Sequence, residues 1–369
     1  MMKIGILNLS WANDNYGAIL QAVGLEQTLK NLGYEAETIN IFYKTKICDL
    51  FSKNGVKRVL RKIIFKSNIN NAHSLVQFRN NNMNLTKKVF FDSSDFYKHK
   101  FDFDACIVGS DQVWKDVFIN SEWVQVYFLD FLRDDINKIA YAASFGKDTW
   151  TAGADTTQYI KNCLQKFNAV SVREIGGVKI CKEIFGIDAQ TAIDPSLLVG
   201  RDFWEDVIDK NNSVDHARDI VFFLIHKKKR KMFMRLIEMI RKKSGKQIKE
   251  ISKHNLLGRF YEPVPIWLRK IKNAELVITD SLHGVCFSII FEKQFIAYMP
   301  NENGTLTRIV SLLGQLGISD RLISNVDEKN VDDLLKKNID YSRVNMLLEK
   351  MREDSMDFLK KALDRRDKQ

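Results

Sequence analysis

The segment ITDSLHG, residues 278–284, gathers side chains that can move protons or hold anions. Asp280, Ser281 and His283 come directly after an apolar run, and Gly284 follows, where the missing side chain lets another backbone approach closely. Histidine is the side chain that most readily exchanges a proton near neutral pH. His283 is therefore a candidate catalytic acid, and the alternative is a polar residue that fills a strand-to-helix corner.

The same corner could also bind an anion. Thr279, Asp280 and Ser281 are residue types that cap helices, so a helix is expected to begin near Leu282. The first backbone N–H groups of such a helix point outward and attract phosphate or carboxylate groups.

Charged residues follow two other apolar runs. SVRE places Arg173 where its planar fork could meet a carboxylate or phosphate, or where it could form a structural ion pair. IVGSDQVW places Ser110 and Asp111 after a strand. We expect Ser110 to cap the next helix, whereas Asp111 could accept a hydrogen bond from a ligand hydroxyl.

The segment NLSWANDNYGAILQ forms a turn between the first expected strand and helix, and it contains Asn13, Asp14, Asn15 and Gly17. Small residues there would let polar atoms of a ligand approach the backbone. The pattern is not GxGxxG, so it gives weak support for a dinucleotide. Asparagine and aspartate are also common helix caps for purely local reasons, and both interpretations stay open.

Alternating strands and helices must position these residues. In the first half, strands are expected at 3–9, 35–42, 104–110, 138–146, 169–174 and 189–194, with helices at 18–33, 154–167 and 176–185. Residues 44–100 are rich in Lys and Asn, and we interpret them as an insertion of helices and loops. The alternation predicts a parallel sheet, in which ligands bind at the carboxyl ends of strands.

A second alternating series follows a polar stretch at 199–218, which we interpret as a linker. Its strands are expected at 220–225, 247–252, 275–280 and 294–299, and its helices at 230–243, 265–272, from 283 and from 306. A chain of 369 residues exceeds what one core usually serves. We therefore expect an α/β protein with two Rossmann-like doubly wound domains, 1–198 and 199–369, facing a cleft, and a C-terminal helix at 341–365 that can pack back across both.

Composition excludes several classes of protein. The chain has no 18-residue uncharged apolar run, and polar residues interrupt its N-terminus too early for a signal-peptide core, so a cytoplasmic location is expected. The five cysteines are scattered and none forms a CxxC pair, which argues against disulfides and zinc. No histidine has a partner at metal-ligand spacing, and we expect neither a metal nor a cofactor.

The formal net charge of +11 favours anionic partners. Phosphate-bearing small molecules and acidic lipid headgroups at the inner membrane surface rank above nucleic acid, because no RNA motif or recognition helix is evident. His226 precedes KKKRK, residues 227–231, a run that could attract phosphates or a membrane surface or could be a solvated helix start.

A series of segments, taken in order, resembles the polysaccharide pyruvyl transferase family. They are NYGAILQAVGLEQTLKNLGY, GSDQVW, YFLDF, KIAYAASFG, SVREIGG, DPSLL, NAELVITDSLHGVCFSIIF and RIVSLLGQLGISDRLI. Members of that family are similar to glycosyltransferases of the two-Rossmann-domain type, called GT-B. The characterised members move pyruvate from phosphoenolpyruvate onto two hydroxyls of a sugar as a cyclic ketal, and the resemblance implies this fold and this chemistry here.

The resemblance also implies roles for residues. His283 matches the histidine of the family's Ser-Phe/Leu-His-Gly motif, with Leu282 where many members have phenylalanine, and Arg173 matches the arginine of its Val-Arg-Glu motif. Both are expected to be catalytic. Donor binding is expected from Ser281, Leu282, Gly284 and Arg308, and acceptor binding from Asn15, Tyr16, Gly17 and Asp111. Arg308 could equally stabilise a helix start.

The expected function is therefore pyruvyl transfer in capsule, cell-wall or exopolysaccharide synthesis. The acceptor would be a sugar or a lipid-linked glycan, with residues 1–198 on the acceptor side and 199–369 on the donor side. One general acid near neutral pH is needed to protonate the methylene carbon of phosphoenolpyruvate. The alternatives are a glycosyltransferase of the same fold with a nucleotide-sugar donor, and a binding subunit that has lost turnover.

Overall fold

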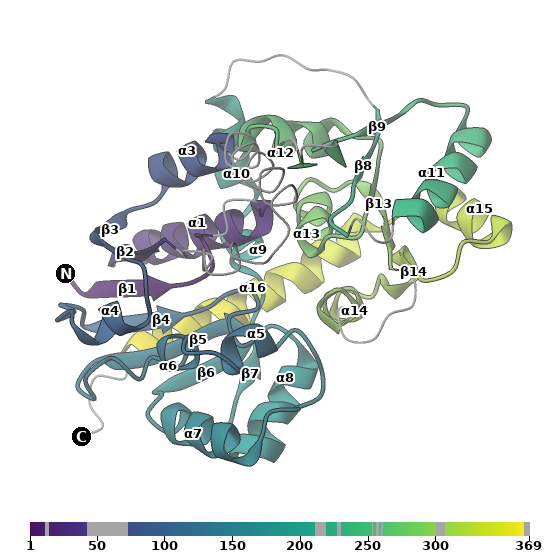
Figure 1. Cartoon of the computed structure of the whole chain (residues 1–369). Helices are drawn as coiled ribbons and strands as arrows, with labels where there is room; N and C mark the ends of the chain where they lie inside the picture. The colour runs from purple at the N-terminus through teal and green to yellow at the C-terminus, as the bar shows by residue number, and fades with distance from the viewer. Residues whose placement is uncertain are drawn as a thin grey trace, which may run out of the picture. The chain divides into compact units, whose positions relative to one another are not determined.

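The computed structural model describes residues 1–11, 15–42, 73–210, 219–226, 230–252, 254–255, 258–259, 261–299 and 307–364 (Figure 1). The chain forms two compact units. Unit 1 contains Met1–Leu198, His254–Tyr261 and Asp354–Gln369, and unit 2 contains Val199–Lys253 and Glu262–Glu353. Among the described residues, no helix is long and apolar enough to cross a membrane.

Unit 1 is built on a seven-stranded parallel sheet in the order β3-β2-β1-β4-β5-β6-β7 (Figure 1). The strands are β1 (Lys3–Leu7), β2 (Glu35–Ile41), β3 (Leu85–Phe90), β4 (Ala105–Val108), β5 (Asn137–Ala143), β6 (Ala169–Val172) and β7 (Gln190–Thr191). The strand order reverses at β1 and β4, and open sheets of this kind bind ligands at the carboxyl ends of such strands.

The helices of unit 1 connect these parallel strands. They are α1 (Tyr16–Asn31), α3 (His73–Asn82), α4 (Ser94–Tyr97), α5 (Asp116–Ile119), α6 (Val124–Tyr127), α7 (Ala154–Leu164), α8 (Ile175–Ile180) and α9 (Pro195–Leu198). A π-helical turn, Cys181–Phe185, continues α8. Helix α1 is buried on nearly all sides, as expected of a helix that is apolar around most of its circumference, and it packs against α9.

The segment expected to hold only helices and loops also contains a strand. β3 pairs in parallel with β2 and extends the edge of the sheet. Its sequence, LTKKVF, exposes Lys87 and Lys88 while Phe90 is buried. Lysines on an edge strand discourage pairing with another chain, and they also obscure the strand pattern. Residues 43–72 lie outside the described part of this segment.

Unit 2 contains a smaller parallel sheet of five strands in the order β14-β13-β12-β8-β9. The strands are β8 (Ile220–Phe223), β9 (Ile248–Glu250), β12 (Leu276–Thr279), β13 (Gln294–Tyr298) and β14 (Leu322–Ile323). The short strands β10 (His254–Asn255) and β11 (Gly258–Arg259) form a separate antiparallel pair that belongs to unit 1.

The helices of unit 2 are α10 (Arg201–Asp209), α11 (Arg230–Ser244), α12 (Val264–Asn273), α13 (Leu282–Ile290), α14 (Thr307–Gln315), α15 (Glu328–Lys336) and most of α16 (Tyr341–Asp364). A 3-10 turn, Ser319–Arg321, precedes β14. The linker expected at 199–218 was therefore wrong in its first half. Arg201–Asp209 forms a helix because Trp204, Val207 and Ile208 make a buried stripe, and 211–218 lie outside the described residues.

Helix α16 supplies residues to both units, since Glu353 belongs to unit 2 and Asp354 to unit 1. Within unit 1, the Asn137 side-chain amide donates to the Ala362 carbonyl at 2.8 Å, and the Ile193 N–H donates to the Ser355 hydroxyl at 3.1 Å. Two doubly wound parallel α/β units and a shared C-terminal helix confirm the expected fold class.

The packing of α1 against α9 leaves no room for a side chain at Gly24. A Cβ atom there would lie 2.6 Å from the Pro195 carbonyl oxygen and 2.8 Å from its carbon. Overpacking against rigid backbone should outweigh the gain in helix propensity, so Gly24→Ala should lower the free energy of unfolding by about 1–2 kcal/mol in urea denaturation. The control is Gly153→Ala, where no atom lies within 4 Å. Equal stability of the two variants would contradict this account.

Candidate functional site

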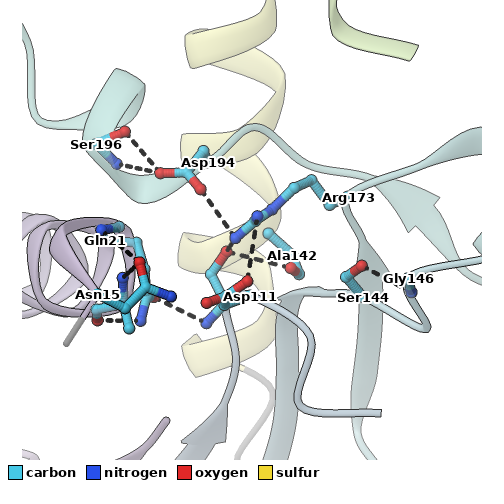
Figure 2. Close-up of polar contacts among 12 residues, drawn as sticks. Asn15, Gln21, Asp111, Ala142, Ser144, Gly146, Arg173, Asp194 and Ser196 are labelled. Atoms are coloured by element: carbon cyan, nitrogen blue, oxygen red, sulfur yellow. Dashed lines mark hydrogen bonds and ion pairs between the residues drawn. The ribbon is translucent and has the colours of Figure 1, made fainter. Parts of the chain in front are cut away.

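Arg173 follows β6 and lies among acidic and hydroxyl side chains of unit 1 (Figure 2). Its Nη2 atom lies 2.8 Å from Asp194 Oδ2 and also donates to the Ser110 hydroxyl, and its Nη1 atom lies 3.9 Å from Asp111 Oδ1. The side chains of Arg173, Asp194 and Asp111 are at most 8% exposed. The arginine therefore forms the ion pair that was one of its two expected roles, and contact with an anionic ligand stays a prediction.

Asp194 links this arginine to the start of α9. Its Oδ1 atom accepts hydrogen bonds from the Ser196 N–H at 2.9 Å and the Ser196 hydroxyl at 2.7 Å (Figure 2). One oxygen of this carboxylate thus accepts hydrogen bonds and the other is paired with the guanidinium, so the buried charge is compensated. Sequence reasoning did not single out Asp194, although it is the aspartate of DPSLL and follows an expected strand.

Two of the five non-glycine residues with left-handed backbone in the described part of the chain belong to the loops around the Arg173 cluster. Asp111 and Ala142 have φ angles of 71° and 47°, and the pairing of β5 with β6 shifts register between Ala140 and Ala143. Left-handed backbone at residues other than glycine costs about 1–3 kcal/mol each and gathers at functional sites. The strained positions motivate a functional hypothesis for Asp111, whose proposed contact with an acceptor sugar stays a prediction.

Gly109 and Ser110 lead into this strained turn. Gly109 has φ of 126°, and a Cβ atom there would lie 2.1 Å from the Tyr141 carbonyl oxygen, so only glycine fits. The Ser110 hydroxyl donates to the Ala142 carbonyl at 3.2 Å. The expected capping role of Ser110 was wrong, because the next helix begins only at Asp116 and Ser110 instead joins the arginine cluster.

Asn15 caps α1, as one interpretation of the first turn expected. Its side-chain oxygen accepts from the Gly17 N–H at 3.0 Å and the Ala18 N–H at 3.4 Å. The Tyr16 ring is buried against Tyr261, with ring centroids 5.7 Å apart. Acceptor binding by Asn15, Tyr16 and Gly17 stays a prediction, and Asn13 and Asp14 lie outside the described residues.

Helix α1 also contacts the Arg173 cluster. The Ser110 N–H donates to the Gln21 side-chain oxygen at 3.3 Å. Next to Arg173 in the sequence, Glu174 Oε1 accepts from the Ser144 hydroxyl at 3.0 Å and the Phe145 N–H at 3.0 Å. Glu174 thereby holds the loop after β5.

In unit 2, the predicted residues surround the start of α13. Ser281 is the N-cap, and its hydroxyl accepts from the Gly284 N–H at 3.3 Å. A Cβ atom at Gly284 would lie 2.5 Å from Thr279 Oγ1, so glycine permits this close approach of helix to strand. Leu282 and His283 are 7% and 6% exposed in the first turn. The structure brings Ser281, Leu282, His283 and Gly284 together, and their functional roles stay predictions.

A second histidine lies at the same edge of this sheet. His226 follows β8, which pairs in parallel with β12, and its Nδ1 atom lies 2.8 Å from Asp280 Oδ2. The sequence did not indicate this partner of His226, which became visible only once β8 and β12 were known to be neighbours. Arg308 is a half-buried residue in the first turn of α14.

The cysteines that the structure describes are Cys106, Cys163, Cys181 and Cys286, and all are free and buried. Burial raises the pKa of the Cys163 thiol to about 11 and that of Cys181 to about 12, so neither is a reactive thiolate near neutral pH. Within the described ranges, no group of three His, Cys, Asp or Glu side chains could hold a metal ion.

The Arg173–Asp194 pair predicts a large effect of Asp194→Asn. The amide would face the guanidinium with a neutral group and leave its buried charge poorly compensated, so the free energy of unfolding should fall by about 3–5 kcal/mol in urea denaturation. Asp188→Asn, which removes the exposed partner of Lys182, is the matched control and should leave stability essentially unchanged. If Asp194→Asn lowered the free energy of unfolding only as little as the control does, the ion pair would not be what holds the cluster together.

Three comparisons place the chain among known proteins. No curated protein matches it. Its fold is similar to the UDP-GlcNAc 2-epimerase from Methanocaldococcus jannaschii, with 13% identity, a TM-score of 0.51, and coverage of 93% of this chain and 94% of that chain. It is also similar to the S. aureus protein MnaA solved with UDP, with 9% identity, a TM-score of 0.52, and coverage of 96% and 91%.

A third similar structure is the UDP-GlcNAc 2-epimerase from Neisseria meningitidis bound to UDP-GlcNAc, with 8% identity, a TM-score of 0.51, and coverage of 98% and 99%. At such identities the likeness shows the fold alone, which is GT-B-like. The family model for polysaccharide pyruvyl transferases matches residues 15–302, well over half of the chain. The chain therefore belongs to the polysaccharide pyruvyl transferase family.

Proposed function

We propose that this protein transfers the pyruvyl group of phosphoenolpyruvate to two hydroxyls of a sugar as a cyclic ketal, with His283 as the proton donor. The observation that carries the proposal is the position of His283. It lies in the first turn of α13, directly beyond the carboxyl end of β12, in a chain of this family. Ligands of open parallel sheets bind at such strand ends.

The chemistry requires an acid at this position. Phosphoenolpyruvate is an electron-rich enol ether, and a proton added to its methylene carbon makes the neighbouring carbon electrophilic. One sugar hydroxyl adds to that carbon, phosphate leaves, and the second hydroxyl closes the ketal. His283 is 6% exposed, so its ring could deliver a proton with little competition from bulk water.

The same helix start suits the donor's charge. Helix α13 contains nine residues, and the partial positive charge at its N-terminus favours a phosphate or carboxylate. We assign donor binding to this unit, through Ser281, Leu282, Gly284 and Arg308. Acceptor binding is assigned to unit 1, through Asn15, Tyr16, Gly17 and Asp111.

Arg173 is proposed to contribute positive charge to the reaction. Its ion pair with Asp194 fixes the direction of the guanidinium, and an oriented guanidinium stabilises developing negative charge without reorganisation. The acceptor class is a precursor of capsule, cell wall or exopolysaccharide. The net charge of +11 supports an anionic donor and, for a lipid-linked acceptor, contact with acidic headgroups at the inner membrane surface.

Phosphate release tests this function directly. The protein is incubated with phosphoenolpyruvate and a panel of p-nitrophenyl glycosides of glucose, galactose, mannose and N-acetylglucosamine, and phosphate and ketal products are measured. We expect phosphate to appear only when an acceptor is present. Release of nucleoside diphosphate from a nucleotide sugar, with no reaction of phosphoenolpyruvate, would instead indicate a glycosyltransferase and overturn the proposal.

His283→Ala should abolish most turnover while leaving the protein folded. Loss of a general acid lowers kcat by at least about 100-fold. His73→Ala, at an exposed position where α3 begins, is the control and should keep wild-type kcat. Circular dichroism and thermal unfolding check that both variants fold. Near-normal activity of the His283 variant would remove this histidine from the mechanism.

A further inference from the structure

His226 and His283 belong to neighbouring parallel strands of unit 2. Thr279 at the end of β12 pairs with Phe223 at the end of β8. His226 comes three residues after Phe223, and His283 comes four residues after Thr279. Both histidines therefore follow the carboxyl ends of adjacent strands, where ligands of such sheets bind.

Asp280 fixes the backbone that carries His226. Its Oδ1 atom accepts from the Ile225 N–H at 2.6 Å, and its Oδ2 atom accepts from the His226 N–H at 3.0 Å. The Asp280 side chain is fully buried. A carboxylate with two backbone donors cannot turn away, so it offers a fixed acceptor to the imidazole.

The contact with Asp280 sets the orientation of the ring. Nδ1 of His226 lies 2.8 Å from Oδ2 of Asp280, and a carboxylate accepts hydrogen bonds, so the proton belongs on Nδ1. In the neutral ring the lone pair is then on Nε2. The His226 side chain is 37% exposed, in contrast to its buried partner. This is the arrangement of an imidazole base oriented by an aspartate.

Ketal formation requires a base as well as an acid. One proton is added to the methylene carbon of phosphoenolpyruvate, and each of two sugar hydroxyls loses a proton as its C–O bond forms. One released proton replaces the proton given by the acid. The other leaves with the phosphate when the C–O bond to phosphate breaks with its electron pair. No oxidant or reductant is needed.

We propose that His226, oriented by Asp280, is the general base that accepts the proton of an attacking acceptor hydroxyl. The inference rests on the proposed pyruvyl transfer and assigns it a second histidine. The two rings are suited to different tasks, because His283 is 6% exposed whereas the side chain of His226 is 37% exposed. His226 Nε2 takes the hydroxyl proton and returns it to the departing phosphate. Asp280 acts through His226 as a positioning residue.

Replacement of the His226 ring should lower the rate without disturbing the loop. The two backbone hydrogen bonds to Asp280 do not involve the imidazole, so they hold the loop even when the ring is replaced. His226→Gln should therefore fold and bind phosphoenolpyruvate as the wild type does. A general base contributes about 100- to 10,000-fold to rate, and kcat should fall by this factor.

The experiment compares wild type, His226→Gln, Asp280→Asn, the double variant and His73→Gln with the acceptor panel given above. Phosphate release gives kcat as a function of pH, and calorimetric titration with phosphoenolpyruvate gives its Kd. We expect the fall of wild-type kcat toward low pH, where a base is protonated, to disappear in His226→Gln. The Kd should change less than about twofold, and His73→Gln should match the wild type throughout.

Asp280→Asn tests the positioning role separately. The amide can donate to Nδ1, which would move the ring proton to Nε2 and remove the base, so kcat should fall although His226 remains. Because Asp280 acts through His226, the double variant should be no slower than His226→Gln alone.

The possible failures are distinguishable. Wild-type kcat and an unchanged pH profile in His226→Gln, with an active wild-type enzyme, would overturn this inference alone. A large rise in the Kd for phosphoenolpyruvate with unchanged kcat would make His226 a donor-binding residue and would also overturn it. If wild-type protein released no phosphate with any acceptor, the proposed function would fail and this inference would fall with it.

Discussion

A buried charge must receive its hydrogen bonds from the protein, and this requirement organises the carboxyl ends of the strands in both units. In unit 1 the charge is Arg173, which meets Asp194, and Asp194 in turn accepts from Ser196. The pair thereby joins β6 to the start of α9, and α9 packs against α1. One ion pair thus links a strand of the sheet to a helix start.

Unit 2 meets the same requirement with a single carboxylate. Asp280 follows β12 and accepts from the backbone after β8, so neighbouring strands are tied together where the chain leaves the sheet. The loop is held by backbone donors, which leaves the imidazole of His226 available for chemistry. In unit 1, two residues with left-handed backbone, Asp111 and Ala142, lie beside the Arg173 cluster. Strained backbone of this kind often occurs at functional sites.

The sequence predicted much of this architecture because the strands are short apolar runs and the helices between them have regular apolar spacing. It failed at β3, where two consecutive exposed lysines hide the alternation, and at α10, where a polar average conceals a buried stripe. It also gave no indication of the partner of His226. This partner is 54 positions away, and no local pattern states that β8 and β12 are neighbours. The left-handed backbone of Asp111 was equally invisible, since aspartate does not require it.

Unit 1 is not made from one continuous stretch of chain. Ser355, Leu359 and Ala362 are buried, and Ser355 and Ala362 satisfy polar groups of Ile193 and Asn137. During synthesis, a ribosome delivers the seven strands of this unit long before it delivers those residues. Until unit 2 has been translated, the Asn137 amide and the Ile193 N–H lack these partners from α16. Unit 1 can therefore be completed only after the C-terminal helix has left the ribosome.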